Sequence, residues 1–254
     1  KPIQVGRVEK MSKSKRNVID TQGVIATYGM DSARLFILFA SPPEKDVFWT
    51  DEGVEGVHRF LGRVWRVTRD NLDLIRDAAP YAGDGADLGE AARELRKLTH
   101  VTVARVTDDI AGRFHYNTAI ARCMELANAL VRLDKVEGDL VPVFADAVRT
   151  LVNLLAPFAP HFAEELWSEI GDGALVADSP WPGWDPDVAR DDVVTVAVQV
   201  LGKLRARVEM PADADREQMQ ALAMESDNVQ RHLEGKTVRK VIVVPGKLVN
   251  IVAN

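Results

Sequence analysis

The sequence predicts a mainly α-helical protein that ends in a small α/β domain. From residue 50 to about residue 170, apolar side chains recur every three or four positions, which is the spacing of one helix face. A segment rich in proline and tryptophan, residues 179–186, interrupts this pattern. Beyond it, apolar residues alternate with other residues at every second position, as in a half-buried strand. These observations indicate an antiparallel helix bundle, a linker and a small sheet.

The residues before position 50 are expected to carry a short strand and two short helices. Residues 3–8 have the composition of a strand. Asp20 can cap a helix that ends at Gly29, and Asp31 can cap a second helix that runs to Pro42. This segment therefore connects the N-terminal residues to the bundle.

The bundle itself is predicted to contain five helices joined by short loops. They are expected at residues 50–78, 88–110, 117–133, 143–155 and 160–170. Burying one large apolar side chain in such a bundle is worth roughly 1.5–3 kcal/mol, so these stripes can support a stable core. Trp181 and Trp184 in the linker are expected to pin it to the bundle rather than to stack on bases.

The C-terminal residues are predicted to form a compact α/β unit. Strands are expected at residues 194–200, 203–208, 238–244 and 248–252, with helices between about 213 and 233. The Leu201-Gly202 pair can form the tight turn of a hairpin between the first two strands.

Basic residues alternate with apolar ones along the second of these strands. In a regular strand, Lys203, Arg205 and Arg207 would share one face and Leu204 would share the other. Further cations follow at positions Lys236, Arg239, Lys240 and Lys247. Together they are a candidate phosphate-contacting surface. The alternative is an ordinary solvated face, because Glu209 and Glu234 partly neutralise the charge.

Charge is distributed unevenly along the chain. The net charge is −6, which argues against a uniformly basic nucleic-acid-binding protein. Residues 1–17 nevertheless carry +5 and residues 199–254 carry +2, so the span between them carries −13. The two ends are the candidate anion-facing surfaces, and the middle is expected to be a scaffold.

Several classes of protein are disfavoured by composition. No apolar run approaches the roughly 18 residues that span a bilayer, and no signal peptide is recognisable. The lone Cys123 excludes an intrachain disulfide framework and a cysteine-based zinc site, and we interpret it as a packed thiol in a reducing compartment. His161 has no histidine four residues later, so we predict a structural or capping role and no metal ligands. The first residue is lysine rather than methionine, which suggests a fragment of a longer protein.

The most basic stretch of the chain is residues 10–16, here called the basic loop. It places four cations and two serine hydroxyls within seven residues, and such a stretch stays in water because burying each ammonium group is unfavourable. Exposed ammonium and hydroxyl groups suit a multiply charged phosphate. A solvated flexible loop is the alternative, and the Gly-x-x-x-x-Gly-Lys pattern of a Walker loop is missing here.

A family resemblance adds to this interpretation. Lys10-Met11-Ser12-Lys13-Ser14 matches the KMSKS signature of class I aminoacyl-tRNA synthetases without a mismatch. Residues 33–46 and 49–56 resemble the leucyl branch of that family. Residues 156–167 resemble its helix-bundle anticodon-binding domain. Segments 200–205 and 235–242 resemble the C-terminal tRNA-binding domain of the bacterial-type leucyl enzymes. Arg16 and Thr21 depart from the residues most usual in the family.

The resemblance implies three domains. Residues 1–49 would be the KMSKS loop and the connecting helices at the end of a catalytic domain. Residues 50–190 would be an anticodon-binding-type helix bundle with its Pro/Trp linker, and residues 191–254 a small α/β tRNA-binding domain. The His-x-Gly-His motif of the nucleotide-binding fold is missing from this sequence, so the chain alone is expected to be inactive.

The activity implied is activation of leucine by ATP, with Mg²⁺, followed by transfer to tRNA(Leu) in a monomeric, cytoplasmic enzyme without a membrane partner. Lys13 is the first catalytic candidate and Lys10 the second. The ATP phosphates would contact the signature residues Lys10, Met11, Ser12, Lys13 and Ser14. tRNA would contact the cations of the C-terminal unit, Lys203, Arg205, Arg207, Lys236, Arg239 and Lys240.

Two alternatives stay open at this level. The chain could be a portion of a valyl, isoleucyl or methionyl synthetase, although it has neither the zinc-ligand cysteines typical of isoleucyl enzymes nor the terminal coiled coil typical of valyl enzymes. It could also be a tRNA-binding or structural module with no catalytic role. Titration with tRNA beside an ATP-binding assay would separate these functions.

Overall fold

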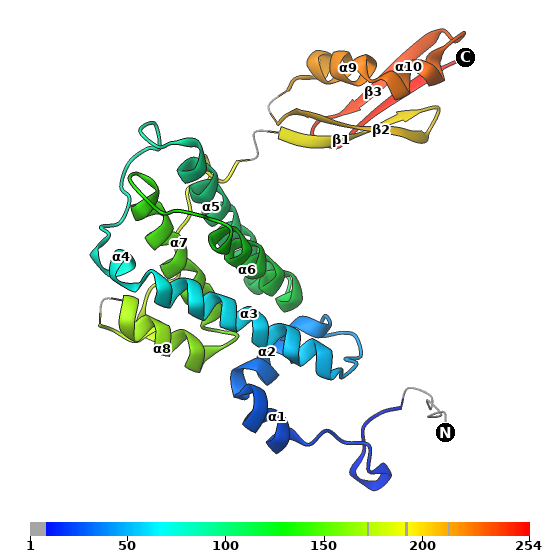
Figure 1. Cartoon of the computed structure of the whole chain (residues 1–254). Coiled ribbons are helices and arrows are strands. Elements are labelled where there is room, and N and C mark those ends of the chain that lie inside the picture. The colour runs from blue at the N-terminus through cyan, green and yellow to red at the C-terminus, as the bar shows by residue number, and fades with distance from the viewer. Residues whose placement is uncertain (1–8, 172, 191–192, 213) are drawn as a thin grey trace. The chain divides into compact units, whose positions relative to one another are not determined.

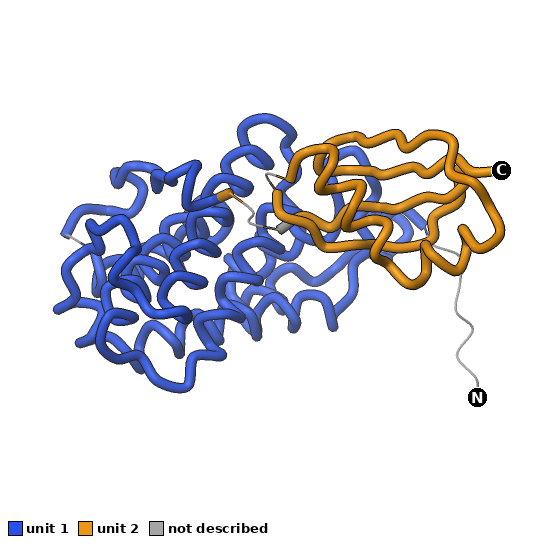
Figure 2. The backbone as a smooth tube through the Cα atoms, turned by 90° about the horizontal axis from the view of Figure 1, so that it is seen from above, with its two compact units in different colours: residues 1–189 blue, residues 190–254 orange. Residues whose placement is uncertain are grey.

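The structure, a computed structural model, describes residues 9–171, 173–190, 193–212 and 214–254. It divides into two compact units, residues 1–189 and residues 190–254 (Figures 1 and 2). This division lies beside the boundary expected after residue 190. The further division expected at residue 50 falls inside unit 1 and stays a prediction, and the strand expected at residues 3–8 lies outside the described residues.

Two short helices follow the basic loop, which contains the 3-10 turn η1 (Lys13–Lys15). Helices α1 (Thr21–Tyr28) and α2 (Met30–Ala40) meet at Gly29 with a bend of 109°. Asp20 caps α1 as predicted, because its carboxylate accepts the N–H of Gln22. The predicted capping role of Asp31 in α2 is wrong. Gly29 is the N-cap of α2, and the Asp31 carboxylate accepts hydrogen bonds from a different helix.

Six further helices form the bundle (Figure 1). They are α3 (Asp51–Asp70), α4 (Leu72–Asp77), α5 (Glu90–Ala111), α6 (Tyr116–Val131), α7 (Leu140–Leu155) and α8 (Pro160–Ile170). The first predicted bundle helix is therefore two helices. Asn71 separates them, because its side chain donates back to the Val67 carbonyl 2.8 Å away and competes with the regular helical pattern.

Helix α7 is the centre of the core. Most of its residues are buried, and it contacts α4, α5, α6 and α8. The core around α7 contains the fully buried side chains Phe60, Ile120, Phe144, Leu151 and Leu155. The elements of the chain confirm the mainly α-helical fold.

Arg149 on α7 connects the ends of two other helices. Its guanidinium donates to the carbonyls of Ile75 and Ala78 at the end of α4 and to the carbonyl of Ile170, 3.2 Å away, at the end of α8. The last carbonyls of a helix have no partner within that helix, so a cation placed there satisfies them and the helix dipole together. One side chain therefore secures α4, α7 and α8.

The linker after α8 contains the short turn η2 (Val176–Asp178) and then crosses the bundle. The Trp181 indole N–H donates to the Thr107 hydroxyl at 2.8 Å, which confirms that this residue pins the linker. The Asn153 amide donates to the carbonyl of residue 180 at 3.1 Å, and the Asp185 N–H donates to His100 Nδ1 at 2.9 Å. The linker therefore belongs to the packed part of unit 1.

Unit 2 is a four-stranded sheet with two helices on one face. Its elements are β1 (Val193–Val200), β2 (Lys203–Pro211), α9 (Arg216–Glu225), α10 (Asp227–Leu233), β3 (Val238–Val244) and β4 (Leu248–Ala253). The strand order is β2-β1-β4-β3, with β1 parallel to β4 and the other pairs antiparallel. Helix α9 starts later than predicted, because Asp215 and Gln218 form a capping box there.

Among the described residues, no single helix is long and apolar enough to cross a bilayer. The α1–α2 pair meets the length and composition criteria only when its two bent halves are counted together.

Replacing Arg149 with alanine should lower the free energy of unfolding of unit 1 by about 2–4 kcal/mol, because it leaves the half-buried carbonyl ends of α4 and α8 without a donor. Urea unfolding followed by tryptophan fluorescence measures this. All five tryptophans lie in unit 1, so the signal reports on that unit, and they are Trp49, Trp65, Trp167, Trp181 and Trp184.

A suitable control for this prediction is Arg122→Ala. Arg122 forms an exposed ion pair with Glu125 at 3.3 Å, and such pairs contribute less than about 1 kcal/mol. Equal losses in the two variants would show that the Arg149 contacts have no special role.

Candidate functional site

The basic loop is largely exposed, and its backbone is closed by the short 3-10 turn η1. Backbone bonds from the Lys15 N–H to the Ser12 carbonyl and from the Arg16 N–H to the Lys13 carbonyl close η1. Arg16 has a φ of 53°, in the left-handed region where glycine and asparagine are favoured. The loop thus has a defined backbone conformation although its side chains face solvent.

Asn17 holds the two sides of this loop together. Its side-chain oxygen accepts the Ser12 N–H at 2.7 Å, and its amide nitrogen donates to the Lys10 carbonyl at 3.3 Å. The motif pattern did not identify this role. An asparagine directly after a run of cations was the available signal, because its amide can donate and accept at once.

The lysines of the loop differ in their partners. Lys15 forms an ion pair with Glu9 at 2.7 Å. Within the described part of the chain, the ammonium groups of Lys10 and Lys13 make no ion pair or hydrogen bond. The two hydroxyls of Ser12 and Ser14 are 2.7 Å apart and bond to each other. The structure therefore leaves two ammonium groups and part of a hydroxyl pair free to meet a phosphate.

A hollow of about 860 Å³ lies beside the loop. Its loop side is formed by Glu9, Lys10, Met11, Asn17 and Ile19, and its other side by residues 46–49. Phe48, on that second side, is 60% exposed, which is unusual for a phenylalanine. A hollow of this size, with an apolar wall and an ammonium group, has room for a nucleotide.

We also searched the structure for side chains that could hold a metal ion. In the described ranges, no group of three or more His, Cys, Asp or Glu side chains is arranged to hold a metal ion. We therefore derive no step through Mg²⁺.

The second predicted surface, on unit 2, is arranged differently from the expectation. A bulge places Arg205 between the pairs Val198–Ala206 and Gln199–Leu204, so the alternation of β2 is interrupted. As a result Leu204 is 51% exposed and Arg205 is half-buried. The prediction that Lys203, Arg205 and Arg207 line one face is wrong.

The sheet face without helices, here called the open face, keeps two of the predicted cations. Arg207 pairs with Ala197, and Lys240 pairs with Val252, in the register of the open face. Both cations are exposed, as is Ile242 on the same face.

The other five predicted cations of unit 2 occupy different positions, and one of them, Lys247, lies exposed in the turn between β3 and β4. Lys203 pairs with Val200 on the helix-covered side, and Arg205 and Arg239 lie in the bulges. The Lys236 ammonium donates to the His232 carbonyl at 2.8 Å. The seven predicted cations of unit 2 therefore do not form one continuous row.

Helix α3 carries a row of arginines that the sequence interpretation did not single out. Arg59, Arg63 and Arg66 are spaced by four and three positions, so they lie along one side of the helix. Arg59 pairs with Glu55, whereas the Arg63 Nε is buried without a partner among the described residues. Arg63 and Arg66 border a hollow of about 380 Å³ whose other walls come from α6, the loop after it and α7. The spacing of the three arginines was the available signal.

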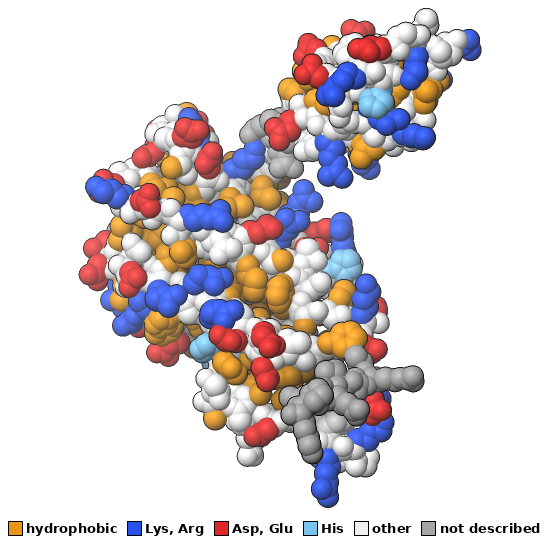
Figure 3. All heavy atoms as spheres, turned by 45° about the vertical axis from the view of Figure 1, so that its right-hand side comes forward, with side chains coloured by type: hydrophobic (Ala, Val, Ile, Leu, Met, Phe, Trp, Pro, Cys, Tyr) orange, Lys and Arg blue, Asp and Glu red, His pale blue; other side chains and the backbone are white. Residues whose placement is uncertain are grey.

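On the face shown in Figure 3, Lys and Arg side chains are interspersed with Asp and Glu. This agrees with the negative net charge of the chain and disfavours nucleic-acid binding over the whole of that face.

Two other candidates have structural roles. Cys123 is fully buried, and this burial raises the pKa of its thiol to about 12, so it stays a protonated, packed side chain. The His161 Nδ1 lies 3.0 Å from the Asp31 carboxylate beside the start of α8, in line with its predicted structural role.

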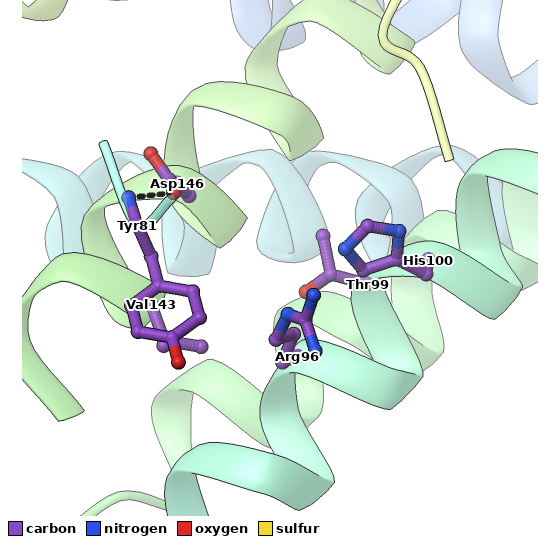
Figure 4. A pocket seen from close by; sticks show the side chains of 6 residues that line it. All are labelled: Tyr81, Arg96, Thr99, His100, Val143 and Asp146. Atoms are coloured by element: carbon purple, nitrogen blue, oxygen red, sulfur yellow. Dashed lines mark hydrogen bonds between the residues drawn. The ribbon is translucent and has the colours of Figure 1, made fainter. Parts of the chain in front are cut away.

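A small cavity of about 50 Å³ lies between α5, α7 and the loop before α5 (Figure 4). The Tyr81 N–H donates to the Asp146 carboxylate at 2.9 Å, while the Arg96 guanidinium lies 5.4 Å from the Tyr81 ring centre. Burial raises the pKa of Asp146, and burial together with Arg96 lowers the pKa of His100. A cavity of this size has room for a few water molecules and is too small for a substrate, so it is part of the packing.

Family comparisons agree with this geometry. Residues 92–220 match the family described as the anticodon-binding domain of tRNA ligase. Residues 3–50 match class I tRNA synthetases (I, L, M and V). The first match covers half of the chain.

Relatives in several bacteria are similar over nearly the whole chain. It is 48% identical to a leucine--tRNA ligase of Desulfatibacillum aliphaticivorans over 99% of its length. It is also 48% identical to one of Chromohalobacter salexigens over 100%, and 49% identical to one of Syntrophobacter fumaroxidans over 96%. The chain spans only 29–30% of the length of these curated relatives.

A solved structure has a similar fold. The agnB2 LeuRS of Agrobacterium radiobacter K84, crystallised as a ternary complex with tRNA and LeuAMS, matches with a TM-score of 0.79 and 31% identity. The match covers 96% of this chain and 32% of that chain.

The hydrogen bond between His100 and the linker predicts that the stability of unit 1 depends on pH. Its Nδ1 must be unprotonated to accept the Asp185 N–H, and the folded-state pKa is below the ordinary value of 6.5. Above pH 6.5 both states are neutral there. As the pH falls below 6.5, the unfolded chain binds a proton that the folded chain resists, so unit 1 loses stability until the pH reaches the folded-state pKa.

Urea unfolding of wild type and His100→Gln between pH 7.5 and 5 measures this loss. The stability of wild type should fall more steeply in that range, and His115→Gln is a control that should resemble wild type. Parallel pH profiles for wild type and His100→Gln would contradict the role of His100.

Proposed function

Because the chain belongs to the family of tRNA ligase anticodon-binding domains, we propose that it is part of a leucine--tRNA ligase. The whole enzyme would activate leucine with ATP and transfer it to tRNA(Leu). The observation that carries this proposal is the intact KMSKS string as an exposed loop ahead of α1, α2 and the bundle, with two lysines that have no ion pair among the described residues. The names of the relatives support the leucyl branch over the valyl, isoleucyl and methionyl alternatives.

Lys13 and Lys10 would act on the phosphates of ATP during activation. When the leucine carboxylate attacks the α-phosphate, negative charge builds up on the departing pyrophosphate. An ammonium group that meets this charge stabilises the transition state more than the ground state, and this difference accelerates the reaction. Lys10 and Lys13 are suited to this role because neither has an acidic partner to leave within the described residues.

The neighbouring residues would shape the loop. Ser12 and Ser14 share one hydrogen bond, so one hydroxyl hydrogen of the pair is available to a phosphate oxygen. Met11 contributes to the apolar part of the hollow beside the loop. Asn17 would keep Lys10 and Ser12 at a constant separation while the lysine side chains move.

The remaining surfaces would contact tRNA. In unit 1, Arg63 and Arg66 on α3 offer guanidinium groups to phosphates beside a hollow. In unit 2, Arg207 and Lys240 offer cations on the open face. These contacts would position the RNA and would not by themselves read its sequence.

The tRNA-binding roles of Lys203, Arg205, Lys236 and Arg239 stay predictions. So do the cytoplasmic location, the monomeric state, the Mg²⁺ requirement and the inactivity of this chain alone.

Replacing Lys13 with alanine in the full-length ligase should slow leucine activation about 100- to 1000-fold, the usual effect of removing one preorganised contact to developing charge. Leucine-dependent exchange between ATP and pyrophosphate measures activation. Affinity for tRNA should change little.

The matched control is Lys15→Ala, which removes a lysine of the same loop that is already paired with Glu9. Its effect on exchange should be under about tenfold, as expected for a cation engaged elsewhere. Normal exchange in the Lys13 variant would reject the catalytic assignment. No exchange in the unmodified full-length protein would favour the non-catalytic module.

The double variant Arg207→Ala/Lys240→Ala should weaken tRNA binding by the full-length protein and reduce the dependence of affinity on salt concentration by about two phosphate contacts. Titrations at several salt concentrations measure both quantities. The control Arg216→Ala/Arg231→Ala removes the same charge from the helices of unit 2. If this control has the larger effect, the open face is not the surface that binds tRNA.

A further inference from the structure

We infer that Asp31 is the positioning residue of the basic loop, because it attaches the two helices that carry this loop to the N-terminus of α8. The inference rests on the proposed function of the loop in activation. Asp31 touches no phosphate in this role and acts through the helices α1 and α2.

Asp31 is a buried carboxylate with three partners. It is 8% exposed. One oxygen accepts from Arg34 at 2.9 Å and lies 3.0 Å from His161 Nδ1. The other oxygen accepts the backbone N–H of Phe162 at 2.7 Å. A carboxylate with so little exposure needs such partners, so these bonds define where the start of α2 lies.

Helix α8 cannot satisfy its own first turn. Its N-cap is Ala159, which has no side-chain oxygen, and its first residue is Pro160. The free N–H groups of a helix start carry partial positive charge, and a carboxylate is their preferred partner. Asp31 supplies this carboxylate from 131 residues away in the sequence. The two helices are thereby coupled through a bond that neither can replace locally.

On the α1 side of the bend at Gly29, the segment is held by side chains that stay partly exposed. Val24 and Tyr28 of α1 pack against the core, but none of the residues of α1, all of which are described, is buried. His58 of α3 contributes weaker contacts, since its Nδ1 lies 3.2 Å from the Tyr28 carbonyl and 3.3 Å from the Ser32 hydroxyl. The apolar anchors Leu35 and Phe36 lie one turn farther along α2.

Because α1 separates the bend at Gly29 from the basic loop, a small change of angle at the bend moves the loop by a larger distance. Eight helical residues span about 12 Å, so a tilt of about 10° at Gly29 would displace the far end of α1 by about 2 Å. A misplacement of about 1 Å in a catalytic group can slow a reaction about 100-fold. Loss of the Asp31 contacts should therefore affect activation although no phosphate contact is removed.

The experiment uses the full-length ligase with Asp31→Ala, Asp31→Asn and a matched control, Glu164→Ala. Glu164 also lies on α8 and also accepts backbone N–H groups, those of Val176 at 3.0 Å and Ala177 at 3.1 Å. Its loss removes a comparable set of bonds without touching α1 or α2. The three variants are compared in leucine-dependent ATP–pyrophosphate exchange.

We expect Asp31→Ala to lower kcat about 10- to 100-fold with the KM for leucine within about threefold of wild type. Asp31→Asn keeps an oxygen for the Phe162 N–H and should recover part of this loss. Glu164→Ala should stay within about threefold of wild type in both parameters. Equal loss of kcat in Asp31→Ala and Glu164→Ala would overturn the inference, since a general loss of stability would then explain both.

Hydrogen exchange on the 254-residue chain separates the inference from the proposed function. In Asp31→Ala, amides of α1 and of the first turn of α8 should exchange faster, while those of α5 and α7 stay unchanged. Unchanged exchange in α1 would overturn the positioning role. If the unmodified full-length protein shows no leucine-dependent exchange of pyrophosphate, the proposed function fails, and the hydrogen-exchange result still shows whether Asp31 holds the segment.

Discussion

Unit 1 depends on how the two ends of α8 are satisfied. The start of this helix meets a carboxylate from α2, and its end meets a guanidinium from α7. Glu169 on the same helix pairs with Arg69 of α3 and Arg76 of α4. Apolar stripes bring helices together but tolerate sliding, whereas charged bonds to helix ends specify one position. The same short helix thus adds a charged contact to the apolar packing of α2 on α3 and α6, and together these attach the segment with the basic loop to the bundle.

The basic loop has two requirements that burial cannot meet together: its lysines must stay exposed, and they must be held in position. Its lysines must stay in water to remain available, so burial cannot position them. Position is instead transmitted from the core through α2, the bend at Gly29 and α1. Within the loop, Asn17 fixes the backbone, and Glu9 pairs with Lys15, whereas Lys10 and Lys13 have no ion pair in the part of the chain that the structure describes. Asn17 therefore orders the backbone of the loop, while Lys10 and Lys13 supply the exposed ammonium groups.

Local patterns in the sequence predicted those features whose cause is local. Apolar spacing gave the helices of the bundle, Asp20 gave the start of α1, and Leu201-Gly202 gave the hairpin turn, where both residues have positive φ. Asp31 was assigned to its own helix because its true partner lies 131 residues away. The bulges at Arg205 and Arg239 arise from pairing between strands, so alternation along one strand could not reveal them. Likewise the motif identified the basic loop, but only the structure distinguishes its paired lysine from its unpaired ones.

The bulges also bear on the proposed binding of tRNA. A row of cations along β2 would have followed a phosphate backbone on its own. With the row interrupted, the open face presents two cations beside exposed Leu204 and Ile242. Two phosphate contacts give only weak binding at physiological salt. The arginines of α3 belong to the other unit, so in the proposed complex a second set of contacts on the same RNA would become intramolecular once the first has formed. A net charge of −6 is compatible with tRNA binding on these terms, because affinity then comes from several small cationic sites joined by one chain and not from a general positive field.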